Sequence, residues 1–389
     1  MKGAYDAEAL HKLAVIKEAK RWQAHHLIEQ DQLETIRNEY TTKLYHPNWM
    51  IRILLFAASL LGLSGVSGLA ATFVAEVQMG ENAIAVACMF YGIISFLILE
   101  KGFIGNQHYK SGVTEALLYH ACGFTIGGLG IWVDFNPHDM LMVCLLLFAF
   151  TSMRYLDLLS TLTAILSFAG ILFFESYSGG TAVRQLIPFL FMIVFAFVYW
   201  YSRKLKKERS LWLWQNNFLV VESVSLLFIY LGGNYLVVRE LSTGLMDLSL
   251  EEGQDIPYAF IFYFLTVLIP IVFLYGGIKF RDIVLLRVSL FVLAFSVFTF
   301  RYYFSLGHPE VALTISGVIL LAVSIALIHY LKINRRGFTR ENILSSKWAN
   351  VNAEAFLVSQ TLGGNQGSAD SAWKGEGGSF GGGGSSGSF

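Results

Sequence analysis

About ten apolar runs, each close to the length of a membrane-spanning helix, constrain the fold of this 389-residue chain more than any other feature. A helix that crosses a bilayer needs roughly 20 predominantly apolar residues. The runs occupy residues 50–74, 82–100, 112–133, 139–153, 155–175, 185–202, 213–238, 257–278, 283–304 and 310–332. Only 14% of the residues are charged, against roughly 25% in a water-soluble domain. The sequence therefore predicts an all-α fold, a polytopic transmembrane helix bundle.

The boundary between the fourth and fifth runs leaves the number of spans open. The fourth run is short, and Met153, Arg154 and Tyr155 separate it from the fifth. A re-entrant pair at this point would replace two full crossings without changing the orientation of the other spans. Arg154 and Asp157 stand three residues apart and are expected to pair on one helix. Ten short-looped spans also permit, without requiring, a five-plus-five inverted repeat of the kind many transporters use.

The distribution of lysine and arginine predicts the orientation, because cytoplasmic loops carry an excess of both. If the N-terminus is cytoplasmic, the cytoplasmic loops collect Lys101, Lys110, Arg154, the basic block 203–209, Lys279, Arg281, Lys332, Arg335 and Arg336. The opposite side collects only Arg184, Arg239 and Arg301. Both termini are therefore predicted to lie in the cytoplasm.

The segments outside the apolar runs divide the chain into domains. Residues 1–49 carry two helical patterns, the first ending near Gln23 and the second opening on Asp31 and Glu34, which resemble a capping box. They predict a small cytoplasmic helical hairpin on the membrane surface, followed by the transmembrane bundle at 50–332. A cytoplasmic segment covers 333–358.

The last segment, 359–389, is a tail rich in glycine and serine. Such a composition buries too little apolar surface to offset the entropy of ordering the chain. This tail is predicted to be disordered and dispensable for folding.

Small residues in two of the spans favour close helix packing, because they let helix backbones approach each other. Gly62, Gly65 and Gly68 recur every three residues in the first span. Gly123 and Gly127 form a GxxxG pair in the third. In the eighth span, Pro270 with Gly276 and Gly277 predicts a break in the helix, where freed backbone groups can line a site.

Ionisable side chains at membrane depth are the best indicators of a functional site, since each costs roughly 2.5–3.5 kcal/mol to insert at the centre of a helix. Glu222 lies near the middle of the seventh run, and His120 and Glu115 lie in the third. Glu222 is predicted either to be a structural acid, hydrogen-bonded to a group such as Ser225, or to face a cavity as a proton or cation site. In the second interpretation, His120 and Glu115 are the neighbours expected to exchange protons with it.

Two arginines at span ends on the predicted outer side, Arg239 and Arg301, complete the set of ligand-binding candidates. They predict either an anionic ligand or a structural pairing with the many acidic residues of the outer loops.

No sequence motif indicates a cofactor or a particular enzyme activity. Cys88, Cys122 and Cys144 lie in apolar runs and form neither a disulfide framework nor a CxxC metal motif. No two histidines share a helix face within one span, so haem ligation has no support. Sequences typical of metalloproteases, prenyl-diphosphate enzymes, nucleotide-binding loops and serine hydrolases do not occur. We therefore expect no cofactor, no metal and no catalytic residue that can be named, and the zero net charge gives no indication of a nucleic-acid partner.

The N-terminal stretch "RWQAHHLIEQDQLETIRNEY", followed by many spans, resembles a widespread group of uncharacterised bacterial multispanning membrane proteins. The matching residues are Trp22, Leu27, Ile28, Gln30 or Gln32, and Tyr40. His26 stands where that group usually has glycine. The tail "GGSFGGGGSSGSF" is similar to tails of other bacterial membrane-protein families, among them proteins with a TPM domain. Both resemblances imply a location in the bacterial inner membrane, and neither implies an activity.

Three hypotheses for the function remain after these observations. The leading one is a protein that binds or transports a small or lipidic ligand within the bundle. The second is a membrane scaffold or sensor that recruits cytoplasmic protein partners through its N-terminal hairpin and its tail. The third is an intramembrane lipid-modifying enzyme that uses Glu222 or Glu115 as general acid or base.

Overall fold

The structure is a computed structural model that describes residues 3–24, 26–244 and 254–303, together with scattered helical positions between 314 and 329. Most of the described residues are helical, and their only strand-like pairing is an isolated bridge between Tyr45 and His108. The all-α prediction is therefore confirmed for this part of the chain. The tenth apolar run, the segment 333–358 and the Gly/Ser-rich tail lie outside the described stretches.

The chain divides into two compact units. The described residues of the larger unit are 3–13, 41–244 and 254–303, and those of the smaller unit are 14–24, 26–40 and the scattered positions between 314 and 329. All the long apolar helices and every candidate site residue belong to the larger unit.

The smaller unit contains the second half of α1 (Ala7–Ala24) and the helix α2 (Gln30–Glu39). The capping box of α2 is formed by Glu29, whose N–H donates to the Gln32 side chain at 2.9 Å. The predicted box of Asp31 and Glu34 is wrong, because the helix already begins at Gln30. Apolar side chains of both helices and of the turn between them form one cluster of Ala19, Trp22, Ile28, Leu33 and Ile36. That these helices lie as a hairpin on the cytoplasmic membrane surface stays a prediction.

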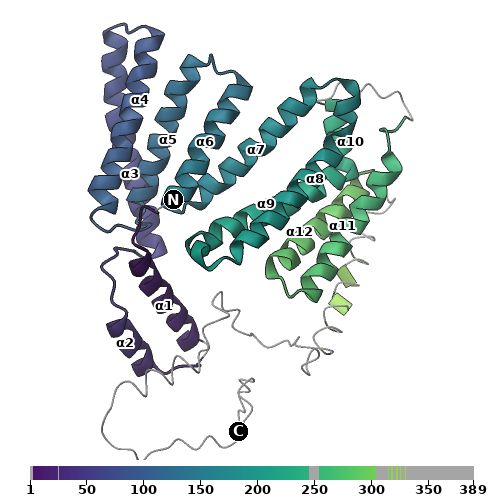
Figure 1. Cartoon of the computed structure of the whole chain (residues 1–389), viewed down its shortest axis with the longest axis horizontal. Helices are drawn as coiled ribbons and strands as arrows, with labels where there is room; N and C mark the ends of the chain where they lie inside the picture. The colour runs from purple at the N-terminus through teal and green to yellow at the C-terminus, as the bar shows by residue number, and fades with distance from the viewer. Residues whose placement is uncertain are drawn as a thin grey trace, which may run out of the picture. The chain divides into compact units, whose positions relative to one another are not determined.

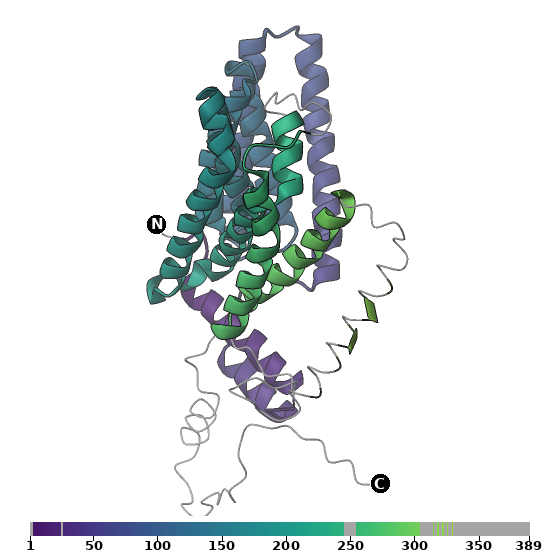
Figure 2. The same cartoon turned by 90° about the vertical axis from the view of Figure 1, so that its right-hand side faces the viewer.

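The larger unit is a succession of helices, most of them long and joined by short connections (Figure 1). They are α3 (Trp49–Glu76), α4 (Glu81–Leu97) with the π-helical η1 (Ile98–Ile104), α5 (Val113–Trp132), α6 (Pro137–Tyr155), α7 (Leu158–Ser178), α8 (Thr181–Lys206), the 3₁₀ turn η2 (Arg209–Trp214), α9 (Gln215–Gly233), α10 (Tyr235–Gly244), α11 (Ala259–Lys279) and α12 (Ile283–Tyr303). Eight of the first nine apolar runs thus coincide with a single long helix, and the seventh covers α9 and part of α10. Figures 1 and 2 show α4 beside α5 and α8 beside α9, and α9 also contacts α7, α11 and α12.

Seven of these elements are long and apolar enough to cross a membrane, which indicates a multi-pass membrane protein. They are α3, α4 with η1, α7, α8, η2 with α9, α11 and α12. The helices α5 and α6 are of similar length but carry more polar side chains, including Glu115 and His120 in α5 and Arg154 in α6. The uncertain boundary near Arg154 is a sharp turn, in which Leu156 takes a left-handed conformation between α6 and α7.

The seventh predicted span is two helices rather than one. Its helix α9 ends at Gly233, Asn234 has an extended backbone, and α10 begins at Tyr235. The broken ends are satisfied from side chains: Tyr235 N–H donates to Thr266 Oγ1 at 2.9 Å, and Val237 N–H donates to Asn234 Oδ1 at 3.2 Å. These bonds let buried backbone groups leave the helix without becoming unpaired.

The predicted break at Pro270 is absent, since α11 runs without interruption from Ala259 to Lys279. Pro270 has no N–H to donate to the carbonyl four residues earlier, that of Thr266. Ser296 Oγ on α12 donates to this carbonyl at 2.9 Å instead. Gly276 and Gly277 allow α12 to approach closely, because a Cβ on either would lie 2.9 Å from Leu285 or Leu286.

The glycines predicted to mediate close packing do not do so among the described residues. A Cβ added at Gly62, Gly65 or Gly68, or at either glycine of the GxxxG pair, would meet nothing within 4 Å. The close contact lies between α4 and α5 instead, where a Cβ on Gly92 would lie 2.5 Å from Thr125 Oγ1, and one on Gly128 2.7 Å from the Ala85 carbonyl. Spacing along one helix does not reveal which face meets a neighbour.

Candidate functional site

The predicted site residues do not form one site. Glu115 and His120 lie on α5, Glu222 on α9, Arg239 on α10 and Arg301 on α12. Each of the first four has partners on other elements or in its own helix, and Glu222 is not brought to Glu115 or His120. The structure therefore separates the predicted proton-exchange partners.

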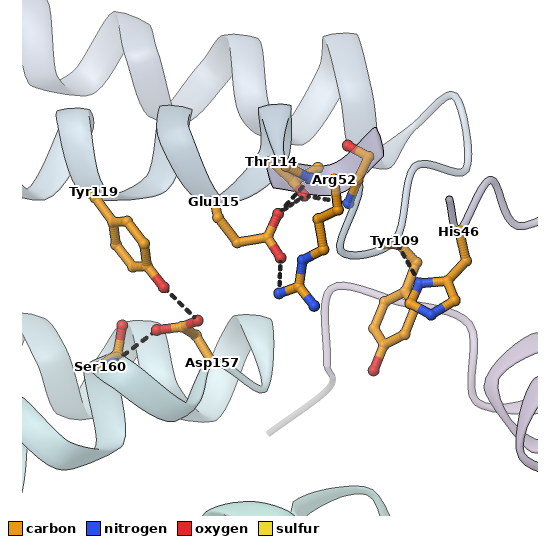
Figure 3. A network of polar contacts seen from close by, with 10 residues as sticks. His46, Arg52, Tyr109, Thr114, Glu115, Tyr119, Asp157 and Ser160 are labelled. Atoms are coloured by element: carbon orange, nitrogen blue, oxygen red, sulfur yellow. Dashed lines mark hydrogen bonds and ion pairs between the residues drawn. The ribbon is translucent and has the colours of Figure 1, made fainter. Parts of the chain in front are cut away.

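Glu115 is held by contacts to both of its carboxylate oxygens (Figure 3). Oε1 pairs with the Arg52 guanidinium from α3. Oε2 accepts hydrogen bonds from Gly112 N–H at 2.8 Å and from Thr114 Oγ1 at 2.9 Å. Gly112 has φ +92°, and a Cβ there would lie 2.2 Å from the Arg52 carbonyl, so this turn requires glycine. Glu115 thus caps α5 and fastens it to α3.

Aromatic side chains adjoin this acid on the loop side. His46 Nδ1 lies 3.1 Å from the Tyr109 carbonyl, which holds the segment before α3 against the loop before α5 (Figure 3). Burial raises the pKa of the Tyr109 hydroxyl to about 12. Burial, reinforced by the charge of Glu115, also raises the pKa of the Tyr5 hydroxyl. Both phenols are therefore neutral hydrogen-bonding groups at physiological pH.

Arg154 and Asp157 do not pair with each other, contrary to the prediction. The helix ends at Tyr155, so the two side chains lie on different elements. The Arg154 guanidinium binds the Glu100 carboxylate in a bidentate manner, with distances of 3.0 and 2.9 Å. Asp157 caps α7 by accepting from Ser160 N–H at 2.7 Å and also accepts from Tyr119 Oη at 3.0 Å (Figure 3).

His120 lies one turn and a half after Glu115 on α5, half-buried among aromatic rings. Its Nε2 is 3.3 Å from Tyr91 Oη, and its ring contacts those of Tyr91 and Phe124. No group of three or more metal-ligating side chains occurs in the described part of the chain. This environment gives His120 the features of a packed polar group.

Glu222 has a different environment from Glu115, because only one of its oxygens has a partner. The residue is fully buried on α9, and Oε2 pairs with Lys206 Nζ of α8 at 2.9 Å. Oε1 is buried and has no hydrogen-bond partner in the described residues. The same is true of Ser225 Oγ, one turn further along α9, so the predicted bond between these two side chains is absent.

A second ion pair adjoins Glu222. Arg203, one turn before Lys206, donates to Asp282 Oδ2 at 2.7 Å and to Tyr199 Oη at 2.6 Å. Asp282 also caps α12, since its Oδ1 accepts from two backbone N–H groups at the start of that helix. The end of α8 is thereby joined to α9 and to the start of α12 by two ion pairs, whose two acids and two bases balance in charge.

Sequence reasoning missed Lys206, Arg203 and Asp282 as parts of this site. It placed the end of the sixth span at residue 202 and assigned the basic block to a loop, whereas α8 continues to Lys206. The signal that could have found the lysine is the short connection between α8 and α9. It forces an antiparallel pair in which residues at the two ends face each other.

The two arginines predicted on the outer side, Arg239 and Arg301, are not both part of a polar cluster. Only Arg239 joins one. Arg239 donates to Tyr235 Oη at 2.8 Å, and that hydroxyl lies 2.7 Å from Asp255 Oδ1. Tyr263 donates to the second oxygen of Asp255 at 3.0 Å. Arg301 is exposed in the last turn of α12. Of the two predicted interpretations, pairing with an acid describes Arg239, with a tyrosine between the two charges.

Comparisons with known proteins add no relative: no family model matches the chain, and no curated protein or solved structure matches it.

Proposed function

We propose that this multi-pass membrane protein binds or transports a small or lipidic ligand within its helix bundle, and that Glu222 couples this process to a proton or a monovalent cation. In this proposal the bundle has about ten spans in a bacterial inner membrane, with both termini in the cytoplasm. The observation that carries it is the fully buried Oε1 atom of Glu222, which has no partner among the described residues.

An unpartnered carboxylate oxygen is unusual in a folded interior. Leaving a buried polar group without a hydrogen bond costs about 1–3 kcal/mol, and more for a charged group. An acid that serves only to join helices is expected to have both oxygens occupied, as Glu115 has. Glu222 thus retains one oxygen that a proton or a small cation can occupy.

The partner of Glu222 provides a connection to water. The Glu222 side chain is 1% exposed, whereas that of Lys206 is 30% exposed. A proton that reaches Oε1 neutralises the carboxylate and removes the attraction that holds Lys206 Nζ at 2.9 Å. The ammonium can then turn toward solvent on its flexible stem. The switch therefore has two states. In one, Glu222 is charged and paired with Lys206; in the other, Glu222 is protonated and Lys206 points toward solvent.

The location of the pair favours coupling to the rest of the bundle. Helix α9 contacts α7, α8, α11 and α12, so a change at Glu222 acts on the helix that joins most of the others. The break at Asn234 lies three helical turns further along the same helix. Discontinuous helices form the ligand sites of many transporters.

Infrared difference spectroscopy on the protein in liposomes tests the proposal. A pH step should produce the carbonyl band of a protonated carboxyl group in wild-type protein, and Glu222→Gln should remove it while folding is kept. Glu115→Gln is the matched control, because its oxygens are already occupied, and it should leave the band unchanged. A band that persists in Glu222→Gln, or that Glu115→Gln removes, would contradict the assignment to Glu222.

A flux measurement tests the transport part. Liposomes that contain a pH-sensitive dye should acidify faster with wild-type protein than with Glu222→Gln under the same proton gradient. Equal rates for both proteins, in the presence of the infrared band, would restrict the role of Glu222 to ligand binding.

A further inference from the structure

An apolar groove lies between four helices, away from the Glu222 pair. It has a volume of about 110 Å³, and all ten residues that line it are apolar. The lining includes Phe173 of α7, Ile187 and Phe191 of α8, Phe228 of α9, and Val237 and Leu241 of α10. Both sides of the break at Asn234 contribute to it, so the groove lies along the junction between α9 and α10.

The groove belongs to helices whose neighbouring side chains are exposed and apolar. Phe174 of α7 and Leu186 of α8 are 42% and 53% exposed. Helices α7 and α8 are both long and apolar enough to span a membrane. In a bilayer, the surface beside the groove therefore contacts acyl chains rather than water.

A basic side chain stands at one end of this groove. Arg184 lies in the first turn of α8, and Ile187 and Phe191 follow it at spacings of three and seven residues, which places the three on one face of the helix. Phe173 and Tyr177 stand four residues apart on α7, with their rings stacked. Arg184 and Tyr177 thus lie at the helix ends, and the groove residues lie about 5–10 Å deeper at 1.5 Å per residue.

The arginine is fixed in position but keeps donors for a ligand. Its Nε donates to the Tyr177 carbonyl at 2.9 Å, and its guanidinium lies 3.9 Å from the centroid of the Tyr177 ring. No acidic side chain pairs with it among the described residues. A guanidinium has five N–H donors, so the terminal nitrogens can still bind a phosphate in a bidentate manner.

We infer that this is a binding site for a glycerophospholipid, with its phosphate on Arg184 and part of one acyl chain in the groove. The amphipathic arrangement carries the inference: a cation at the membrane boundary continues, on the same helix face, into an apolar cavity. A free phosphate would use only the arginine, and a fully apolar molecule only the groove. The site is separate from the proposed proton site and does not depend on it.

Photo-crosslinking in membranes tests this site. The full chain is reconstituted in phosphatidylcholine vesicles with a small fraction of phosphatidylglycerol that carries a photoreactive group on its acyl chain. Labelling of wild-type protein should saturate, compete with unlabelled phosphatidylglycerol, and map to peptides of α8 and α10. Label spread over all exposed helices, without saturation, would overturn the site.

Two pairs of variants separate the contributions of groove and charge. Leu241→Trp fills the groove and should abolish the saturable label, whereas Ile193→Trp, at a 69% exposed position on α8, should not. Arg184→Gln should raise the half-saturating phosphatidylglycerol concentration about fivefold, the effect of one basic residue near an anionic lipid surface. Arg301→Gln removes another arginine at the end of a long helix and should leave that concentration unchanged.

Folding and the proposed proton site are controlled separately. Thermal unfolding of each variant identifies any that does not fold, and Val237→Phe then replaces Leu241→Trp as the groove-filling change. Glu222→Gln should label like wild type, so failure of the proton-site proposal leaves this test intact. If Leu241→Trp and Val237→Phe both fold and both label like wild type, the groove is not the site. An unchanged half-saturating phosphatidylglycerol concentration in Arg184→Gln would equally contradict the inference.

Discussion

Glu115 and Glu222 are both buried acids that pair with a base from a neighbouring helix, but they differ in what happens to the second oxygen. The second oxygen of Glu115 accepts two hydrogen bonds, from Gly112 N–H and Thr114 Oγ1. The second oxygen of Glu222 accepts none among the described residues. Burial and charge alone would have ranked these residues equally. The occupancy of each oxygen therefore distinguishes an acid that only joins two helices from a candidate binding group.

The two bases differ as well. Arg52 reaches Glu115 with a planar guanidinium, and Lys206 reaches Glu222 with a single ammonium on a flexible stem. A guanidinium loses less freedom for each hydrogen bond that it forms, whereas an ammonium changes position readily. The first pair therefore has the chemistry of a fixed contact and the second that of a contact that can open.

The largest effect in this comparison is expected from Glu115→Ala. The change removes the acceptor of a buried backbone N–H, of a hydroxyl and of an arginine in one step, and should lower the free energy of unfolding by about 3 kcal/mol. Thermal or denaturant unfolding of the purified protein measures it. Glu81→Ala, in the exposed first turn of α4, is the control and should cost less than about 1 kcal/mol. If Glu115→Ala lowers the free energy of unfolding no more than the control does, Glu115 does not fasten α5 to α3.

Lys206→Met should have the next largest effect. It leaves the Glu222 carboxylate buried without its counter-charge and should cost about 2 kcal/mol, less than for a fully buried pair because Lys206 is partly exposed. The double variant Lys206→Met/Glu222→Gln removes the stranded charge and should recover most of the loss. Lys204→Met, exposed in the same last turn, gives the matched control.

A double-mutant cycle on these proteins measures the coupling between the two side chains. Equal losses in Lys206→Met and in the double variant would mean that the lysine stabilises the protein through packing rather than through Glu222.

The fold was largely predictable because its signals are local. An apolar run of about 20 residues identifies a long helix by itself, and nine such runs coincide with helices in the described chain. The details that failed depend on neighbours. The break at Asn234 requires Thr266 from another helix to cap Tyr235, and the continuity of α11 through Pro270 requires Ser296.

The candidate site was predictable only in part, for the same reason. A carboxylate inside an apolar run identifies Glu222 and Glu115 as candidate site residues. Their partners are 16 and 63 residues away along the chain, and one of them had been assigned to a loop. Neither the spacing nor the composition of a single helix reports whether a carboxylate oxygen is occupied, and this occupancy separates the two acids.

The smallest change in stability is expected from substitution of a hydroxyl on the helix of each acid: Thr114 on the helix of Glu115, and Ser225 on the helix of Glu222. The two substitutions should differ in their effect. Thr114 Oγ1 donates to Glu115, so Thr114→Val should cost about 1 kcal/mol. Ser225 Oγ has no partner in the described residues, so Ser225→Ala gives up no hydrogen bond and should change the free energy of unfolding by less than about 0.5 kcal/mol. If Ser225 instead helps Glu222 hold a proton or a cation, Ser225→Ala should shift the pH at which the carboxyl band forms while stability stays constant. Unfolding and infrared titration of the same sample therefore separate a hydroxyl without a role from one that helps Glu222. If Ser225→Ala lowers the stability as much as Thr114→Val does, the Ser225 hydroxyl is bonded, and the contrast between Glu115 and Glu222 is wrong.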